Sequence, residues 1–161
     1  MSRLGVDATA RNWVVGELAQ IGVVTDDLEA AIDAYARLGL GPFARLDTDY
    51  HARFRGVQVH IANRNAFAAW SETLHIEIVE PGVGDGPQKT WLRERGPGVF
   101  HIGYATDDVK QRPTGVEVAF EVLDSAIVFL DTVHDLGYYV ELFTRATVAR
   151  IRARIDATAP G

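Results

Sequence analysis

The chain has 161 residues, 47% of them hydrophobic and 24% charged, so it can bury a core of its own. Its formal net charge is −6 and it has no basic block, which argues against nucleic acid and anionic membrane surfaces as main partners. It contains no cysteine, so any metal must be held by histidine, carboxylate or amide side chains. No apolar run reaches membrane-spanning length and no signal-peptide core opens the chain, so we expect a soluble cytoplasmic protein.

The first half of the chain predicts the order strand, helix, strand, strand, strand. After a polar lead-in over residues 1–15, the first strand is expected over 18–25. A helix is expected over 28–38, because apolar residues recur there at helical spacing behind an acidic first turn. Three further strands are expected, rich in β-branched and aromatic residues: 43–50, 57–63 and 74–81. The segments between them are read as a loop and a connection: 51–56 and 64–73.

The second half follows the same order with one element shortened. A short helix over 88–96 ends at Gly96-Pro97, and an apolar strand over 98–108 follows. The next segment is too short for a crossover helix and contains Pro113, so we expect a loop or a single turn. Three more strands are expected: 116–123, 126–133 and 137–144. Tight turns should join them: Asp124-Ser125 and 134–137.

The C-terminal segment over 146–157 predicts a surface helix, because apolar residues recur in it at helical spacing between arginines. We expect these arginines to form a solvated face or the rim of a dimer rather than a ligand site.

Two stretches of the sequence repeat one plan. Gln20-Ile-Gly followed by Thr25-Asp-Asp matches His101-Ile-Gly followed by Thr106-Asp-Asp at identical spacing. Such a repeat predicts two copies of one supersecondary unit, with Gln20 and His101 at equivalent strand positions. We therefore divide the chain into a lead-in, a first module, a linker with a short helix, a second module, and a C-terminal helix and tail: 1–15, 16–81, 82–97, 98–144 and 145–161.

The two strand-helix-strand-strand-strand units, the His101-Ile-Gly strand and the late Val140-Glu-Leu strand resemble the vicinal oxygen chelate superfamily. This group includes glyoxalases, methylmalonyl-CoA epimerases, extradiol dioxygenases and bleomycin-resistance proteins. The resemblance covers residues 16–144, and the segment from Glu80-Pro81 to His101 is most similar to the epimerase branch. It implies an α+β fold in which two βαβββ modules curl into half-barrels, the second with a shortened crossover helix, and four strand residues converge on a divalent metal.

Carried over position by position, the resemblance implies four metal ligands: Gln20, Glu77, His101 and Glu141. Taken singly, each is more simply read as a structural or exposed polar residue, and only the match of all four to equivalent repeat positions favours a site. One imidazole, two carboxylates and one amide suit a divalent ion such as Zn, Co, Ni or Mn. Glu141 and Glu77 are then the candidate catalytic bases. The weaker candidates for a substrate pocket are His75, Tyr104, Arg53 and Phe100.

Three functions remain open from the sequence. The first is an isomerase, epimerase or lyase, in which a metal stabilises an enediolate while a glutamate moves an α-proton. The second is a binding protein that holds an antibiotic or another small molecule without a metal, which the shortened second crossover favours. The third, an Fe(II) extradiol dioxygenase, needs two histidines and a carboxylate, but Gln20 stands where the first histidine should be.

In each case the expected partner is a small molecule. We also expect a homodimer, because open half-barrels leave exposed sheet edges and apolar rims.

Overall fold

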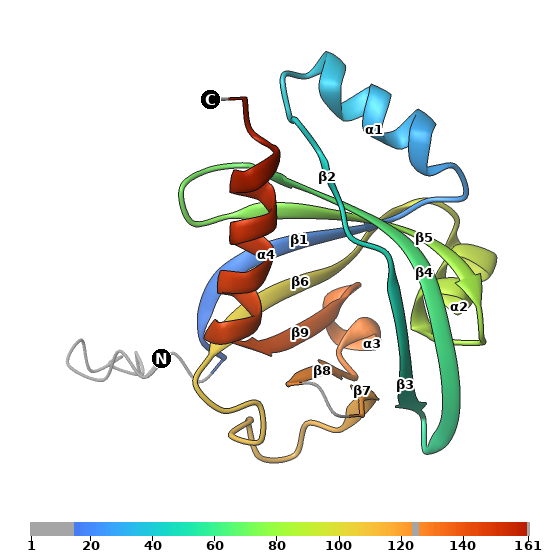
Figure 1. Cartoon of the computed structure of the whole chain (residues 1–161). Helices are drawn as coiled ribbons and strands as arrows, with labels where there is room; N and C mark the ends of the chain where they lie inside the picture. The colour runs from blue at the N-terminus through green and yellow to red at the C-terminus, as the bar shows by residue number, and fades with distance from the viewer. Residues whose placement is uncertain (1–14, 124–125, 161) are drawn as a thin grey trace, which may run out of the picture.

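The computed structural model describes residues 15–123 and 126–160, which form one curved sheet with helices around it (Figure 1). The strands are β1 (Glu17–Val24), β2 (Ala44–Arg45), β3 (Thr48–Phe54), β4 (Val57–Ala69), β5 (His75–Val83), β6 (Gly98–Thr106), β7 (Val118–Val122), β8 (Ile127–Leu130) and β9 (Tyr139–Thr144). The helices are α1 (Leu28–Arg37), α2 (Pro87–Arg95), α3 (Val133–Leu136) and α4 (Arg145–Thr158). Within the described ranges, no helix is both long and apolar enough to cross a membrane.

Backbone hydrogen bonds join the strands into a ring. The strand order is β2-β4-β3-β7-β8-β9-β6-β1-β5, and β5 pairs in addition with β4. The long strand β4 closes the ring because its first part pairs with β3 and its second part with β5. The expected α+β fold with a curved sheet is thus confirmed. Because the ring is closed, exposed sheet edges no longer support the expectation of a homodimer. That expectation now rests on apolar side chains that remain at the surface, such as Leu38 and Val57.

The two units repeat the same pairing. The first and last strands of each unit run parallel, β1 with β5 and β6 with β9, while β1 and β6 lie antiparallel beside each other. Helix α1 connects β1 to the next strands of the first unit, whereas the described segment 107–117 between β6 and β7 contains no helix. The shortened second crossover is therefore confirmed, as the short segment and Pro113 predict.

The strand boundaries differ from expectation around the β3–β4 hairpin. The segment 51–54 belongs to β3 and the segment 64–69 to β4, so the expected loop and connection there are wrong. The chain turns instead at Arg55-Gly56, where φ is 49° and 81°. Asn63 ends the expected strand over 57–63 and Asn65 falls in the expected connection, yet both side chains are buried on the inner face of β4.

Smaller differences occur near the C-terminal strands. The expected turn over 134–137 contains the short helix α3, and the expected strand over 126–133 is reduced to β8. The expected tight turn at Asp124-Ser125 and residues 1–14 of the lead-in lie outside the described residues.

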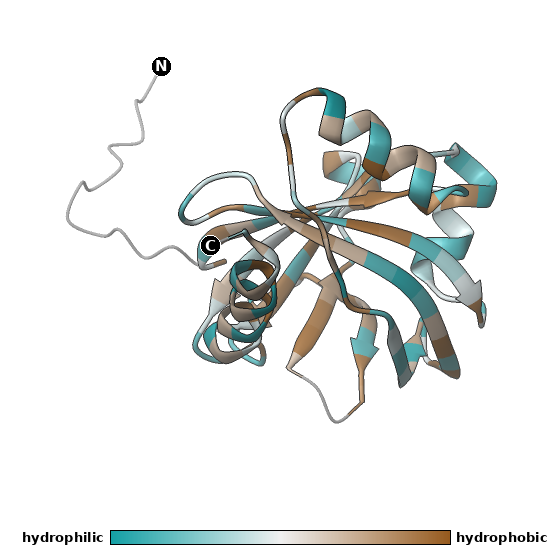
Figure 2. Cartoon of the chain, turned by 45° about the horizontal axis from the view of Figure 1, so that its top comes forward, coloured by the Kyte–Doolittle hydropathy of each residue, from teal (hydrophilic) through white to brown (hydrophobic). Residues whose placement is uncertain are grey.

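Hydrophobic cores lie on both faces of the sheet. The largest is inside the ring and contains Trp91, Phe100, Phe120 and Phe129. On the other face of β5, Leu28 of α1 packs with the buried isoleucines of that strand. Figure 2 shows hydrophilic and hydrophobic residues interspersed along α1 and α4, as in helices with one face on the protein and one in solvent.

Helix α4 lies across the sheet in Figure 1 and contacts β2, β4, β6 and β9. It begins at Thr144, whose hydroxyl accepts a hydrogen bond from the backbone N–H of Thr147 at 3.3 Å. Ile155 anchors the other end against Ala44 and Phe67.

Candidate metal centre and its cavity

The strand register brings the four expected ligands to one place inside the ring. Gln20 on β1 pairs with Gly103 on β6, and Gly22 pairs with His101. In the parallel pairs, Glu77 lies beside Gly22 and Glu141 beside Gly103. The four side chains thus come from the adjacent strands β5, β1, β6 and β9, at repeat-equivalent positions.

The glycine of each Ile-Gly pair makes room for side chains at the candidate site. A Cβ atom on Gly22 would fall inside the His101 ring. A Cβ atom on Gly103 would lie 2.8 Å from Phe143 Cε1 and 2.9 Å from Glu141 Oε2, both of its own unit, and 3.0 Å from Gln20 Cβ of the first unit. In each copy of the repeat, a glycine two residues after the polar residue therefore leaves space for neighbouring side chains of the site.

The four functional groups converge on a common point. His101 Nε2 lies 2.6 Å from Gln20 Oε1, 3.0 Å from Glu141 Oε2 and 3.4 Å from Glu77 Oε2. Gln20 Oε1 is also 2.7 Å from Glu141 Oε2 and 3.2 Å from Glu77 Oε2. Three oxygens that cannot donate a hydrogen bond when the carboxyls are ionised face one imidazole nitrogen, so the cluster needs protons or a cation at its centre.

The Gln20 amide can meet this need in two orientations. With Oε1 toward the centre, Nε2 donates to His75 Nε2 at 2.9 Å, and the centre can hold a cation. With the amide reversed, Nε2 donates to Glu141, Glu77 and His101, and Oε1 accepts from His75. His75 is fully buried, and burial lowers its pKa to about 4, with the charges of Arg152 and His101 adding to the shift. Neutral His75 can accept or donate at Nε2, so its tautomer selects the orientation of Gln20.

The donor set fits a divalent cation in type and spacing. An ion with bonds of about 2.1 Å in octahedral geometry separates neighbouring ligand atoms by about 3 Å, close to the distances between these four groups. Within residues 15–123 and 126–160, no group of three or more His, Cys, Asp or Glu side chains has the arrangement of a metal site by itself, and the Gln20 amide oxygen is the fourth candidate donor. His101 Nδ1 is buried without a hydrogen-bond partner, whereas a ligating histidine ordinarily donates from that nitrogen.

Burial and charge shift the acid–base behaviour of the cluster. Burial raises the pKa of Glu77 to about 7, and the neighbouring Glu141 carboxylate adds to this rise against the opposing effects of His101 and Asn65. Burial opposes protonation of His101, but the carboxylates of Glu141 and Glu77 outweigh it and raise the pKa of the imidazole. Without a cation, the cluster therefore retains protons near neutral pH.

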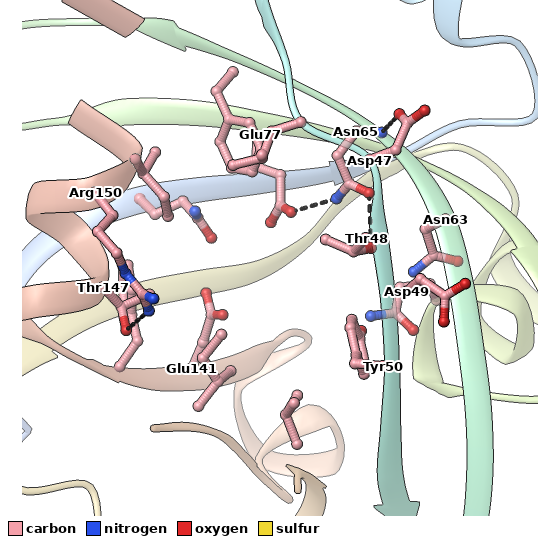
Figure 3. A pocket seen from close by; sticks show the side chains of 18 of the residues that line it. Asp47, Thr48, Asp49, Tyr50, Asn63, Asn65, Glu77, Glu141, Thr147 and Arg150 are labelled. Carbon is pink, nitrogen blue, oxygen red and sulfur yellow. Dashed lines mark hydrogen bonds between the residues drawn. The ribbon is translucent and has the colours of Figure 1, made fainter. Parts of the chain in front are cut away.

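A cavity of about 780 Å³ opens beside the cluster (Figure 3). Gln20, Glu77 and Glu141 line it, and His101 lies behind them with 1% of its surface exposed. One wall is apolar and largely aromatic: Phe67, Phe120, Val122, Ile127, Phe129 and Phe143. A polar part of the lining comes from β3, from β4 and from the segment just before β3: Asp47, Thr48, Asp49, Tyr50, Asn63 and Asn65. Helix α4 contributes Thr147, Arg150, Ile151 and Arg154.

The structure places the weaker pocket candidates differently. His75 lies beside Gln20, one layer behind the cavity wall. Phe100 packs in the core, with its ring edge against His101 and 4.5 Å between centroids. Tyr104 points to the other face of β6 and packs on the Val128 cluster, and Arg53 is exposed beside the inward-facing Ala52. Successive side chains of a strand point to opposite faces of the sheet. Tyr104 and Arg53 each follow a residue that faces the inside of the ring, so their own side chains face outward.

Asn65 is a functional neighbour that the sequence did not suggest. Its Nδ2 donates to Glu77 Oε1 at 2.6 Å and its Oδ1 accepts from the Thr48 hydroxyl at 3.1 Å. This fixes one oxygen of Glu77 and leaves Oε2 facing the centre, as Figure 3 shows. One pattern in the sequence could have indicated that Asn65 faces the site. Every second residue from position 61 lies on one face of an extended strand, and this face contains Ile61, Asn63, Asn65 and Phe67.

Comparisons with known proteins agree with this architecture. Residues 19–128 match the family described as the Glyoxalase/Bleomycin resistance protein/Dioxygenase superfamily. No curated protein matches the chain.

Several solved structures are similar to the chain. A methylmalonyl-CoA epimerase variant from Streptomyces coelicolor, in complex with 2-nitronate-propionyl-CoA, is 26% identical, with 83% of this chain and 97% of that chain covered and a TM-score of 0.52. The methylmalonyl-CoA epimerase from Mycobacterium tuberculosis is 22% identical over 85% of this chain and 93% of that chain, with a TM-score of 0.55. A hypothetical protein from Bacillus halodurans is 18% identical over 80% of this chain and 94% of that chain, with a TM-score of 0.52.

Proposed function

Because the chain belongs to the Glyoxalase/Bleomycin resistance protein/Dioxygenase superfamily, we propose that it is a metal-dependent epimerase, isomerase or lyase that moves a proton at the carbon next to a carbonyl. The observation that carries this proposal is the convergence of Gln20, Glu77, His101 and Glu141 beside a cavity of substrate size. The likeness to a methylmalonyl-CoA epimerase at 26% identity supports the same reaction class.

A divalent ion bound by these four residues would supply Lewis acidity for a substrate carbonyl and so acidify the adjacent C–H bond. Glu77 is the better base candidate. Asn65 holds its Oε1, and its Oε2 faces the centre, where a substrate carbon could approach it. Glu77 would take the proton from the substrate carbon.

Glu141 occupies the equivalent position in the second unit and also lines the cavity. Two carboxyl groups from opposite units can act on opposite faces of one carbon. Removal of the proton by ionised Glu77 and delivery of a proton by protonated Glu141 would invert that carbon, which is an epimerisation. Loss of the proton from Glu77 to solvent and uptake of one by Glu141 would then reset the pair. Return to a different atom would give an isomerisation instead.

The test combines metal analysis with proton exchange. The wild-type protein should carry close to one divalent ion per chain after loading, and it should exchange the α-proton of methylmalonyl-CoA for deuterium, as followed by proton NMR. Glu77→Gln should reduce this exchange by about 100-fold or more, because the base is lost while the side-chain size is kept. Glu121→Gln, an exposed glutamate on β7, is the matched control and should exchange at the wild-type rate.

Failure to take up metal, or exchange that is unchanged in Glu77→Gln, would contradict this function. Metal-free protein that still binds small molecules would instead support a non-catalytic binding protein. The large aromatic cavity wall favours that second candidate.

A further inference from the structure

We propose that Arg150 of α4 binds an anionic group, a carboxylate or a phosphate, of the small molecule that occupies the cavity. This inference deepens the proposed function, because it defines the chemical class of the ligand for the same cavity. It replaces the expectation that the arginines of the C-terminal helix only form a solvated face or a dimer rim.

The other arginines of α4 hold the helix in place. Arg145 donates to Asp107 and Glu17, each at 2.8 Å. Arg152 donates to the backbone carbonyls of Leu74, Ser71 and Glu72 at 3.3, 3.0 and 2.8 Å, and Arg154 donates to the carbonyl of Arg45 at 3.2 Å. With these contacts and the capped N-terminus, α4 is fixed to the strands that surround the cavity.

Arg150 differs from these three residues. Its only hydrogen bond within the described chain is to the Thr147 hydroxyl of its own helix at 3.3 Å, and no described carboxylate lies within ion-pair distance of it. A guanidinium has five N–H donors, so most of its capacity is available to a ligand. Arg150 lines the cavity, and Figure 3 shows its side chain on the same side as Glu141, across from Thr48 and Tyr50.

The aspartates that line the cavity contact other groups and do not pair with Arg150, so the Arg150 end of the cavity can accept an anion. Asp47 accepts a hydrogen bond from the backbone N–H of Asn65 at 3.1 Å, and Asp49 contacts His60 Nε2 at 2.6 Å, so both are engaged in the polar part of the lining. Arg154, one turn after Arg150 on the same helix, also lines the cavity and adds a second positive charge.

The shape and chemistry of the cavity then describe the ligand. An acidic group at Arg150 and a carbonyl at the Glu77–Glu141 end would leave the body of the molecule against the aromatic wall. The ligand class is therefore an organic acid with an apolar body. A guanidinium can bind either a carboxylate or a phosphate with two parallel hydrogen bonds, so the two must be separated by experiment.

Binding of simple probes by the full-length, metal-loaded protein tests this assignment. Calorimetry would compare 4-phenylbutyrate, phenyl phosphate and the neutral 4-phenylbutyramide. Arg150→Gln should weaken binding of the preferred acid by about tenfold or more and leave binding of the amide unchanged. Arg37→Gln removes an exposed arginine in the last turn of α1, outside the cavity, and should match the wild type for all three probes.

The results that would overturn the assignment are specific. They are an Arg150→Gln dissociation constant within about twofold of wild type for both acids, equal wild-type affinity for acid and amide, or no binding of either acid. If phenyl phosphate is preferred and its affinity depends on Arg150, the group is a phosphate. A preference for 4-phenylbutyrate that depends on Arg150 identifies a carboxylate.

Failure of this inference can be separated from failure of the proposed function. If the protein takes up metal and exchanges the α-proton, but Arg150→Gln binds the acids as well as wild type does, only the anion site is rejected. Arg150-dependent acid binding by a protein that takes up no metal would reject only the enzymatic role.

Discussion

At the scale of single residues, Gln20 determines what the candidate centre can hold. Its two amide ends differ chemically, and only the oxygen can face a cation. The neighbour that selects the end is His75, which is buried and contacts Gln20 at 2.9 Å. His75 does not line the cavity, so it would act on a metal only through Gln20 and is a positioning residue.

We therefore expect His75→Leu to lower the affinity for a divalent ion by about 10- to 100-fold, as loss of an outer-sphere partner typically does. The leucine cannot accept from the Gln20 amide, so the amide is free to turn its nitrogen toward the carboxylates. Competition with a chelating dye would measure the affinity. His134→Leu, an exposed histidine, is the control, and equal affinities for wild type and His75→Leu would contradict the positioning role.

His75 also predicts a pH dependence of stability for the chelator-treated protein. Its pKa is lowered from 6.5 to about 4 in the fold, so between these values the unfolded chain binds a proton that the folded chain does not. Stability is therefore lost as pH falls through this window, by about 3 kcal/mol for this group alone. His75→Leu lacks this group, so its free energy of unfolding should not include this loss. In urea titrations, the free energy of unfolding of His75→Leu minus that of wild type should therefore increase as the pH is lowered from 6.5 to 4. A constant difference across that window would show that His75 does not titrate as described.

At the scale of elements, β1 and β6 show how much of the site the sequence could predict. The repeated Ile-Gly and Thr-Asp-Asp pattern gave the equivalence of Gln20 and His101, and alternation on β5 placed His75 and Glu77 on one face. The glycines were part of the same pattern, but their role depends on cross-strand contacts that a single strand does not reveal.

The strands β3 and β4 are longer than the sequence predicts. The turn at Arg55-Gly56 lies within the expected loop over 51–56, but β3 continues to Phe54. β4 continues past the expected end at Asn63 because its second part pairs with β5, and Asn65 is compatible with a strand there because it faces the cavity. The position of Arg150 beside the cavity was not predicted, because helical spacing shows which residues share a face but not what that face covers.

The cross-strand glycine contact predicts the effect of Gly22→Ala. The added methyl group would overlap the His101 ring, and overpacking of this kind typically costs about 1–3 kcal/mol of unfolding free energy. The cost should be smaller when the same change is made in a His101→Ala background, because the ring is then absent. A double-mutant cycle in urea measures this coupling, and equal costs in both backgrounds would contradict the close approach.

At the scale of the whole molecule, a closed ring of strands and one fixed helix define the cavity. The first unit supplies Gln20, Glu77 and the polar wall, the second supplies His101, Glu141 and much of the aromatic wall, and α4 supplies the arginines. The family match over residues 19–128 ends before α4. Within this chain, the helix that follows the matched region therefore contributes the positive end of the cavity.

The glycine beside His101 has a consequence for how such a chain can change over evolutionary time. Gly22 of the first half leaves the space that the His101 ring of the second half occupies. A bulky residue at Gly22 would therefore displace a candidate ligand that lies about 80 positions away in the sequence. Substitutions at these two positions should accordingly be correlated among related chains, because a change at one alters the space available at the other.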